Sequence, residues 1–270
     1  MRRIRAGAHC GCSPPRHRLK LADLTFVVLT KDEERQLDGC LRSLPDGARS
    51  LVYDAESRDG TIGIALALGA DVVIRPWVGF AAARRDAAAS VRTPWIFMLD
   101  ADESLTSDLR EELTLLEPPA DVDAYSTARR NFFCDRWIRG AGWWPDRLVR
   151  LFRNGRAVIE ARNAGSADSI HETWRVDGRC LPLGAPLEHR SYPTLQDYRR
   201  KFARYTALEA NGMQGRVGIA SAIVAWLVAP LRALWLMTGR RGIMDGWRGI
   251  YISVASAYYP AVVRWKALRR

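Results

Sequence analysis

Apolar and polar residues alternate in blocks along the first part of the chain. Four short runs have the length and composition of strands buried on both faces of a sheet, and they lie at 24–30, 50–54, 71–74 and 95–99. The segments between them have the pattern of helices and lie at 31–44, 61–68 and 80–90. This alternation predicts the α/β fold class, with a mostly parallel, Rossmann-like sheet flanked by helices.

Polar residues follow three of these strands at their carboxyl ends. The fourth run stops on three carboxylates, Asp100, Asp102 and Glu103, and two earlier runs end at Thr30 and Asp54. One interpretation is a solvated turn before a helix. The other is a ligand pocket, because the carboxyl ends of parallel strands face one crevice. Asp100 and Asp102 could then share a hard cation such as Mg²⁺, which takes one or two carboxylates plus substrate phosphates.

Composition limits the classes of protein. With 270 residues, of which 48% are hydrophobic and 26% charged, the chain can bury a sizeable core as one large domain or as a domain with an appendage. The net charge of +11 suits nucleic acid, an anionic membrane surface or a phosphorylated substrate. The five cysteines form no CxxC pair, which favours a reducing cytoplasm. Residues 1–22 are expected to be a loose basic extension without a signal peptide.

Several motifs occur in a characteristic order along the chain. They lie at 25–30, 53–61, 75–80, 99–103, 142–146, 150–153, 171–172 and 242–247. Taken together they resemble the family 2 glycosyltransferases of the GT-A fold, most closely the bacterial enzymes that add sugars to the lipopolysaccharide core. A single Asp-x-Asp motif would be weak support, since short acidic motifs arise by chance.

The resemblance implies roles for five residues. Thr30 and Asp54 would hold the uridine of a nucleotide sugar, and Arg84 would contact the nucleotide. Asp100 and Asp102 would bind a divalent metal, Mg²⁺ or Mn²⁺, that bridges the diphosphate, with Asp100 also contacting the donor.

The sequence departs from the family pattern at three positions. Ala55 and Glu56 stand where relatives often have Ser and Gly, and Arg85 stands where Asn is common. Glu56 adds bulk and charge to a tight turn near the nucleotide.

The implied reaction needs cations and a base. A departing nucleoside diphosphate gains negative charge, for which Arg84 and Arg150 are the candidate partners. The acceptor hydroxyl must lose its proton, so a carboxylate has to act as general base in the inverting displacement typical of the family. We favour Glu172 for this role over Asp146. The alternative role of Asp146 is a salt bridge to Arg150 or to its neighbour in sequence, Arg147.

Two histidines have open roles. His171 is a candidate third metal ligand, since imidazole also suits Mn²⁺, or a histidine packed in the core. His189 lies in a predicted strand, and its first interpretation is structural.

The C-terminal third has a different character. Residues 217–237 carry only one charge, Arg232, and are interrupted by Pro230. Their length allows a transmembrane span, but a helix lying in the interface, with Trp226 and Trp235 and basic flanks, fits at least as well. A packed helical subdomain or a dimer contact is the alternative.

The sequence as a whole predicts a metal-dependent, inverting glycosyltransferase. It would move a sugar, from a UDP-sugar donor, to a lipopolysaccharide-core or other lipid-linked acceptor. The predicted organisation is a GT-A catalytic domain at 23–205 and a helical, membrane-interfacial region at 206–270, bound to anionic lipid on the cytoplasmic face of the inner membrane. Two alternatives are weaker. A nucleotidyltransferase acting on a sugar phosphate would normally have a Gly-rich loop after the first strand. A nucleic-acid-binding protein is disfavoured by the acidic cluster, which would repel phosphates.

Overall fold

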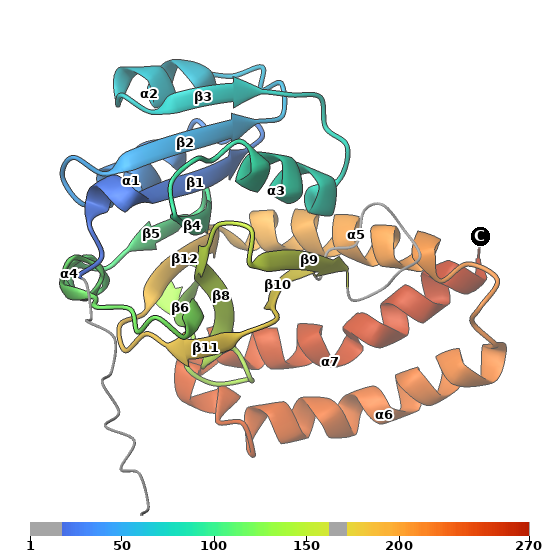
Figure 1. Ribbon diagram of the computed structural model, residues 1–270. Coiled ribbons are helices and arrows are strands. Elements are labelled where there is room, and N and C mark those ends of the chain that lie inside the picture. The colour runs from blue at the N-terminus through green and yellow to red at the C-terminus, as the bar shows by residue number, and fades with distance from the viewer. Residues whose placement is uncertain (1–17, 162–171, 270) are drawn as a thin grey trace, which may run out of the picture.

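The first half of the main sheet is parallel. The computed structural model describes residues 18–161 and 172–269, and its strands run in the order β3–β2–β1–β4 (Figure 1). Their bounds are β1 Leu24–Thr30, β2 Arg49–Asp54, β3 Asp71–Ile74 and β4 Trp95–Asp100. Phe26 and Val28 of β1 pack into one core, whereas Val27 packs into another on the opposite face. Burial on both faces accounts for the continuous apolar runs of β1 and β4. The expectation of such burial was wrong for β3, which lies at the edge of the sheet and has no buried residue. The predicted fold class is confirmed.

Three helices cover the two faces of this half. They are α1 Leu37–Arg42, α2 Thr61–Ala67 and α3 Phe80–Ala89. Side chains of α1 and α2 join the core that contains Phe26, and side chains of α3 join the other. The predicted helix at 31–44 was wrong at both ends. Residues 31–36 form turns instead, because the backbone N–H of Glu33 donates to the Thr61 hydroxyl at 2.8 Å.

The second half of the main sheet is mixed. Beyond β4 the order continues β8–β6–β12–β5, with bounds β5 Glu103–Leu105, β6 Val122–Phe133, β8 Asp146–Arg153 and β12 Leu187–Tyr192. Strand β8 is antiparallel to β4 and β6, and β12 is parallel to β6 and antiparallel to β5. The pairing of β12 with β5 places residues from late in the chain beside the acidic motif.

Shorter elements complete the sheet domain. They are η1 Leu21–Asp23, α4 Ser107–Leu115, β7 Arg136–Trp137, β9 Ala157–Ala161, β10 Glu172–Val176 and β11 Arg179–Pro182. Strands β7 and β11 pair with β6, whereas β9 and β10 form a separate antiparallel pair. The Thr106 hydroxyl accepts from the Leu109 N–H and thereby caps α4.

The C-terminal region is helical. It consists of α5 Leu195–Gly212, α6 Ile219–Met237, η2 Gly242–Asp245 and α7 Gly246–Leu268. Both figures show α6 and α7 lying along each other at one side of the sheet domain. A side chain at Gly249 would overlap the Gly242 carbonyl, so close packing at the start of α7 requires glycine there. Helix α5 continues through residues 205 and 206, the predicted boundary between the catalytic domain and the C-terminal region.

Candidate active site

Three polar strand ends lie together at the carboxyl edge of the parallel strands. Thr30 is in register with Asp54, and Leu29 is in register with Asp100. The Thr30 hydroxyl donates to Asp54 Oδ1 at 2.8 Å. The prediction that these ends share one edge of the sheet is confirmed.

The Asp54 carboxylate organises the turn after β2. It is buried and accepts from the Ser57 N–H at 2.7 Å and from the Ser57 hydroxyl. The Lys31 ammonium donates to the carbonyls of Ala55 and Glu56, at 2.6 Å each. Glu56 has φ 56°, in the left-handed region that favours glycine. The departure from the family pattern noted at Glu56 therefore falls on a position where a side chain is strained.

Asp100 is held between two arginines. Its Oδ1 accepts from Arg84 at 2.8 Å and its Oδ2 from Arg150 at 2.9 Å. Burial alone would raise the pKa of Asp100, but the positive charges of Arg84 and Arg150 outweigh it and hold that pKa well below its usual range. Asp100 is therefore ionised at any physiological pH.

Glu103 neutralises the arginines behind Asp100. Its buried carboxylate pairs with Arg150 and lies 3.3 Å from an Arg129 nitrogen. It also accepts from the Asp100 N–H at 3.0 Å. Arg150 is itself buried among these groups, so its direct partners in the structure are carboxylates of the chain.

Asp102 contacts elements from late in the chain. Its Oδ2 accepts from the Ser191 hydroxyl at 2.6 Å, and the Lys201 ammonium lies 3.4 Å away. His189 Nε2 lies 3.4 Å from Oδ1. Burial raises the pKa of Asp102, but His189, Lys201 and Ser191 together hold it well below the usual value. Sequence reasoning missed Ser191 and Lys201. The alternation of His189 and Ser191 in one strand was the available signal, since it places both on one face.

A chain of polar contacts joins Asp102 to Asp146. From His189, Nδ1 lies 2.6 Å from Asn131 Oδ1, and the Asn131 amide nitrogen donates to Asp146 at 3.1 Å. Because Asn131 Oδ1 can only accept a hydrogen bond, Nδ1 of His189 is assigned as the protonated nitrogen that donates it. His189 is thus part of the candidate site, between two of its carboxylates.

Asp146 pairs with an arginine that the sequence did not suggest. Arg129 donates to it at 2.9 and 2.6 Å, in place of the expected Arg147 or Arg150. Burial raises the pKa of Asp146, but Arg129 and Asn131 lower it below the usual value. A carboxylate with a lowered pKa is a weak base.

The other predicted base and the third predicted metal ligand cannot be placed. His171 and the side chain of Glu172 lie outside the described part of the structure, although the Glu172 backbone begins β10. Both roles remain predictions.

Glu33 is a further acidic residue close enough to Asp100 and Asp102 to be affected by their charges. Burial, followed by the negative charges of Asp102, Asp59 and Asp100, raises its pKa from 4.5 to about 7, although Lys201 opposes the shift. The sequence did not single it out, because its segment was interpreted as a helix. An acidic group that titrates near neutral pH beside ionised carboxylates is typical of functional sites.

The residues at this edge fit a hard divalent cation. Asp100 and Asp102 supply ionised oxygens, and their side chains are 26% and 13% exposed. Within residues 18–161 and 172–269, no three His, Cys, Asp or Glu side chains form a complete metal-ligand group. Asp100 and Asp102 alone would leave several coordination positions of such a cation to other ligands.

The sequence has several known relatives. Residues 25–171 match the family model described as Glycosyl transferase family 2. The chain is 32% identical to the uncharacterized glycosyltransferase RT0209 of Rickettsia typhi, over 87% of this chain and 82% of that protein. It is also 32% identical to the lipopolysaccharide core biosynthesis glycosyltransferase LpsC of Rhizobium meliloti, over 70% of each. A Rickettsia bellii glycosyltransferase is 33% identical, but this match spans only 35% of that protein's length.

Solved structures give weaker likenesses. Staphylococcus aureus TarS 1–349 has a TM-score of 0.45 at 12% identity, over 90% of this chain and 88% of that one. Mycobacterium tuberculosis glucosyl-3-phosphoglycerate synthase, solved with Mn²⁺ and UDP, has a TM-score of 0.31 at 21% identity, over 41% and 43% of the two chains. At these scores the two structures support no inference about the chemistry of this chain.

Proposed function

Because this chain belongs to glycosyltransferase family 2, we propose that it transfers a sugar from a UDP-sugar to a glycan acceptor with inversion. The observation that carries the proposal is the sheet edge, where Asp54, Asp100 and Asp102 lie with Arg84. Open α/β sheets bind ligands at this edge. The paired carboxylates and cations suit a donor with a diphosphate.

The donor would bind across the strand ends. Thr30 and Asp54 are proposed to hold the uridine at the turn after β2, where Asp54 contacts both Thr30 and Ser57. Arg84 is proposed to contact the nucleotide, and its contact with Asp100, a proposed donor-binding residue, supports this role. Asp100 and Asp102, with His171, are the residues that would hold Mg²⁺ or Mn²⁺. When bound, the metal would neutralise charge on the diphosphate.

The transfer is a single displacement. The acceptor oxygen bonds to the anomeric carbon, the bond from that carbon to the phosphate oxygen breaks, and its electron pair leaves with the nucleoside diphosphate. The acceptor proton passes to a general base, for which Glu172 is proposed. Asp146 is the weaker candidate because Arg129 lowers its pKa. Arg150 is proposed to orient Asp100, one of the two carboxylates that would hold the metal.

The base assignment can be tested by two conservative variants. Glu172→Gln should reduce release of nucleoside diphosphate in the presence of acceptor by about 100-fold or more, with donor affinity nearly unchanged. Asp146→Asn should cost less. The reverse ranking of the two rates would transfer the role to Asp146.

The acceptor is proposed to be a lipopolysaccharide-core or other lipid-linked glycan. A relative of 32% identity carries the name of a lipopolysaccharide core enzyme, and the C-terminal region has a surface suited to lipid. In the described residues α6 alone is long and apolar enough to cross a membrane, by length and composition. It buries alanines against the rest of the protein, including Ala222, Ala229 and Ala233.

The solvent-facing side of α6 supports attachment along a membrane surface. At 100° per residue, its exposed Ile, Val, Leu and Trp side chains cover an arc of about 200°. Leu227 and Leu231, in this arc, are 70% and 69% exposed. The one charge, Arg232, falls beside the arc. We therefore propose that residues 206–270 bind peripherally or monotopically at the cytoplasmic face of the inner membrane, with residues 23–205 as the catalytic domain.

Two experiments test the function and the location. A panel of nucleotide sugars, each with Mn²⁺ or Mg²⁺, should yield free nucleoside diphosphate for one donor class, whereas release of pyrophosphate would indicate nucleotidyl transfer.

The full chain should sediment with anionic vesicles and be partly released by high salt. Full retention after alkaline extraction would indicate a true span. Loss of all vesicle binding would leave these helices as packing or oligomer contacts.

A further inference from the structure

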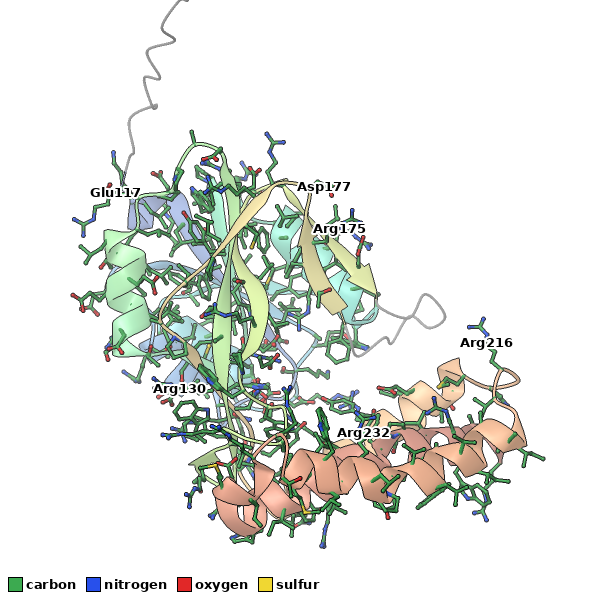
Figure 2. The ribbon with its side chains drawn as sticks, turned by 90° about the horizontal axis from the view of Figure 1, so that it is seen from below. Glu117, Arg130, Arg175, Asp177, Arg216 and Arg232 are labelled. Atoms are coloured by element: carbon green, nitrogen blue, oxygen red, sulfur yellow. The ribbon has the colours of Figure 1, made fainter. Side chains whose placement is uncertain are left out.

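Two arginines share one tryptophan ring on the opposite side of β6 from Asp146. The Arg130 and Arg139 guanidinium carbons lie 5.0 and 4.4 Å from the centre of the Trp137 ring. Their separation is therefore on the order of 10 Å or less. Figure 2 places Arg130 where the sheet domain meets the C-terminal helices.

The two guanidinium groups have no carboxylate partner in the part of the chain that the structure describes. Neither Arg130 nor Arg139 forms an ion pair there. In addition, Arg130 Nε and Trp137 Nε1 are buried N–H groups without a hydrogen-bond partner among the described residues. A buried donor left unsatisfied costs about 1–3 kcal/mol. Two neighbouring cations with two spare donors make a binding site for an anion.

The surroundings limit the source of the anion. The backbone N–H groups of Arg139 and Gly140 donate to Asp245 at 3.0 and 2.7 Å, which fixes the cluster against η2. The neighbouring side chains of η2, Ile243 and Met244, are apolar and 58% and 70% exposed. The cluster therefore lies beside the surface proposed to contact lipid.

The cluster also borders the candidate active site. The ring of Trp144 packs edge-on against Trp137, with centroids 5.1 Å apart, and Trp144 is two residues from Asp146. Two residues of chain span about 7 Å at most. The cluster is thus close to Asp146 along the chain, although it lies on the other face of β6.

We propose that Arg130, Trp137 and Arg139 bind a phosphate group, carried by the lipid-linked acceptor at the membrane surface. Guanidinium groups match phosphate through paired N–H donors, and the indole N–H adds another. The assignment to the acceptor rests on the proposed function, whereas phosphate binding itself does not.

The test uses the full chain and two probes, inorganic phosphate and a water-soluble short-chain phosphatidic acid. Each is titrated by calorimetry and by the NMR resonance of the Trp137 indole N–H, which is assigned by its loss in Trp137→Phe. Phosphate binding should move this resonance. The double variant Arg130→Gln/Arg139→Gln should weaken binding of both probes at least tenfold. Arg136→Gln, on the same hairpin but not over Trp137, should change affinity less than twofold.

The outcomes separate the possible sources of phosphate. Tighter binding of phosphatidic acid than of inorganic phosphate supports a lipid-borne group, whereas equal affinity supports a soluble phosphate ester. A resonance that stays fixed at saturating probe, or a double variant that binds like the parent, overturns the site. If the double variant does not fold, Trp137→Phe serves instead. It keeps an aromatic ring but loses the indole N–H, and it should bind both probes more weakly by calorimetry.

A failure of this proposal is distinguishable from a failure of the proposed function. The double variant should keep the donor affinity of the parent, because neither arginine contacts the strand-end residues. Phosphate binding without release of nucleoside diphosphate from any sugar donor would overturn the proposed function and leave this site standing. Sugar transfer by a double variant whose phosphate affinity is unchanged would overturn this site and leave the proposed function standing.

Discussion

Arg129 and Arg130 are neighbours on β6 and have opposite surroundings. Arg129 lies between Glu103 and Asp146, at 3.3 and 2.6 Å. Arg130 lies over Trp137 and has no carboxylate partner among the described residues. Because alternate residues of a strand point to opposite faces, one strand carries both environments. On one face the chain balances its own charges, and on the other it leaves positive charge for a ligand.

We call the face of β6 with Arg129, Glu103 and Asp146 the balanced face, and the face with Arg130 the unbalanced face. Ion pairs on the balanced face hold its charged side chains in fixed positions. Asp100, Glu103 and Arg150 hold each other through a network in which each carboxylate has a cation as partner. Pre-organised charges of this kind are useful for stabilising a transition state, since they need no reorganisation during the reaction. The unbalanced face has no such network. The free energy of unfolding should therefore depend less on the charges of the unbalanced face than on those of the balanced face.

The largest effect is expected from breaking the balanced network at its buried centre. Glu103→Leu leaves Arg150 and Arg129 short of a partner, and losing one side of a buried ion pair costs about 3–5 kcal/mol. Urea denaturation followed by circular dichroism would measure this loss. Glu117→Leu, at an exposed position, is the control and should change the free energy of unfolding by less than about 0.5 kcal/mol. Similar values for the two variants would mean that the network contributes nothing.

Catalysis should respond strongly to a change at Asp102. Asp102→Asn removes the charge that Ser191 and Lys201 contact, and we expect turnover to fall by about 100-fold or more while the fold survives. Release of nucleoside diphosphate measures turnover. Asp71→Asn, at the other end of a parallel strand, is the matched control and should keep normal activity. Near-normal turnover of Asp102→Asn in limiting metal would defeat the metal assignment.

The balanced face could be predicted in part because of how parallel strands are buried. Strands β1, β2 and β4 are covered on both sides, so they leave apolar runs that end abruptly at Thr30, Asp54 and Asp100. These ends then have to meet at one edge. The partners of Asp102 could not be predicted in this way. Ser191 comes from β12, whose position beside β5 is set by long-range pairing rather than by local pattern.

The unbalanced face left no signal in the sequence. Arg130 and Arg139 are two among many basic residues, and only the turn between β6 and β7 brings them to one indole. Glu33 was missed for a related reason. Its segment has apolar spacing typical of a helix, but its backbone N–H donates to the hydroxyl of Thr61, the first residue of α2, which holds it in a turn.

Replacing each of the two neighbouring arginines tests the comparison directly. Arg129→Gln should lower the free energy of unfolding by about 2 kcal/mol, since it leaves Glu103 and Asp146 without this cation. Arg130→Gln should not lower it, because no carboxylate loses a partner and the unsatisfied Arg130 Nε is removed. The two variants remove the same charge from adjacent positions, so each is the control for the other. Equal losses in urea denaturation would show that the two faces do not differ as described.

The smallest effect concerns Glu33, whose ionised form is disfavoured by burial and by the negative charges of Asp102 and Asp100. Its pKa is about 7 in the folded protein against an ordinary 4.5, so the folded state binds this proton more tightly than the unfolded state. As the pH rises from 4.5 to 7 the unfolded chain loses the proton first, and the parent protein loses stability. Above pH 7 the loss is constant.

Glu33→Gln removes this titration and should make the protein more stable than the parent at pH 8, with no advantage at pH 4. Because Glu33 is partly exposed, we expect only about 1 kcal/mol. Urea denaturation of both proteins at several pH values measures the difference. Glu111→Gln, at an exposed position, should give a flat profile. A flat profile for Glu33→Gln as well would mean that Glu33 does not experience the charges of Asp100 and Asp102.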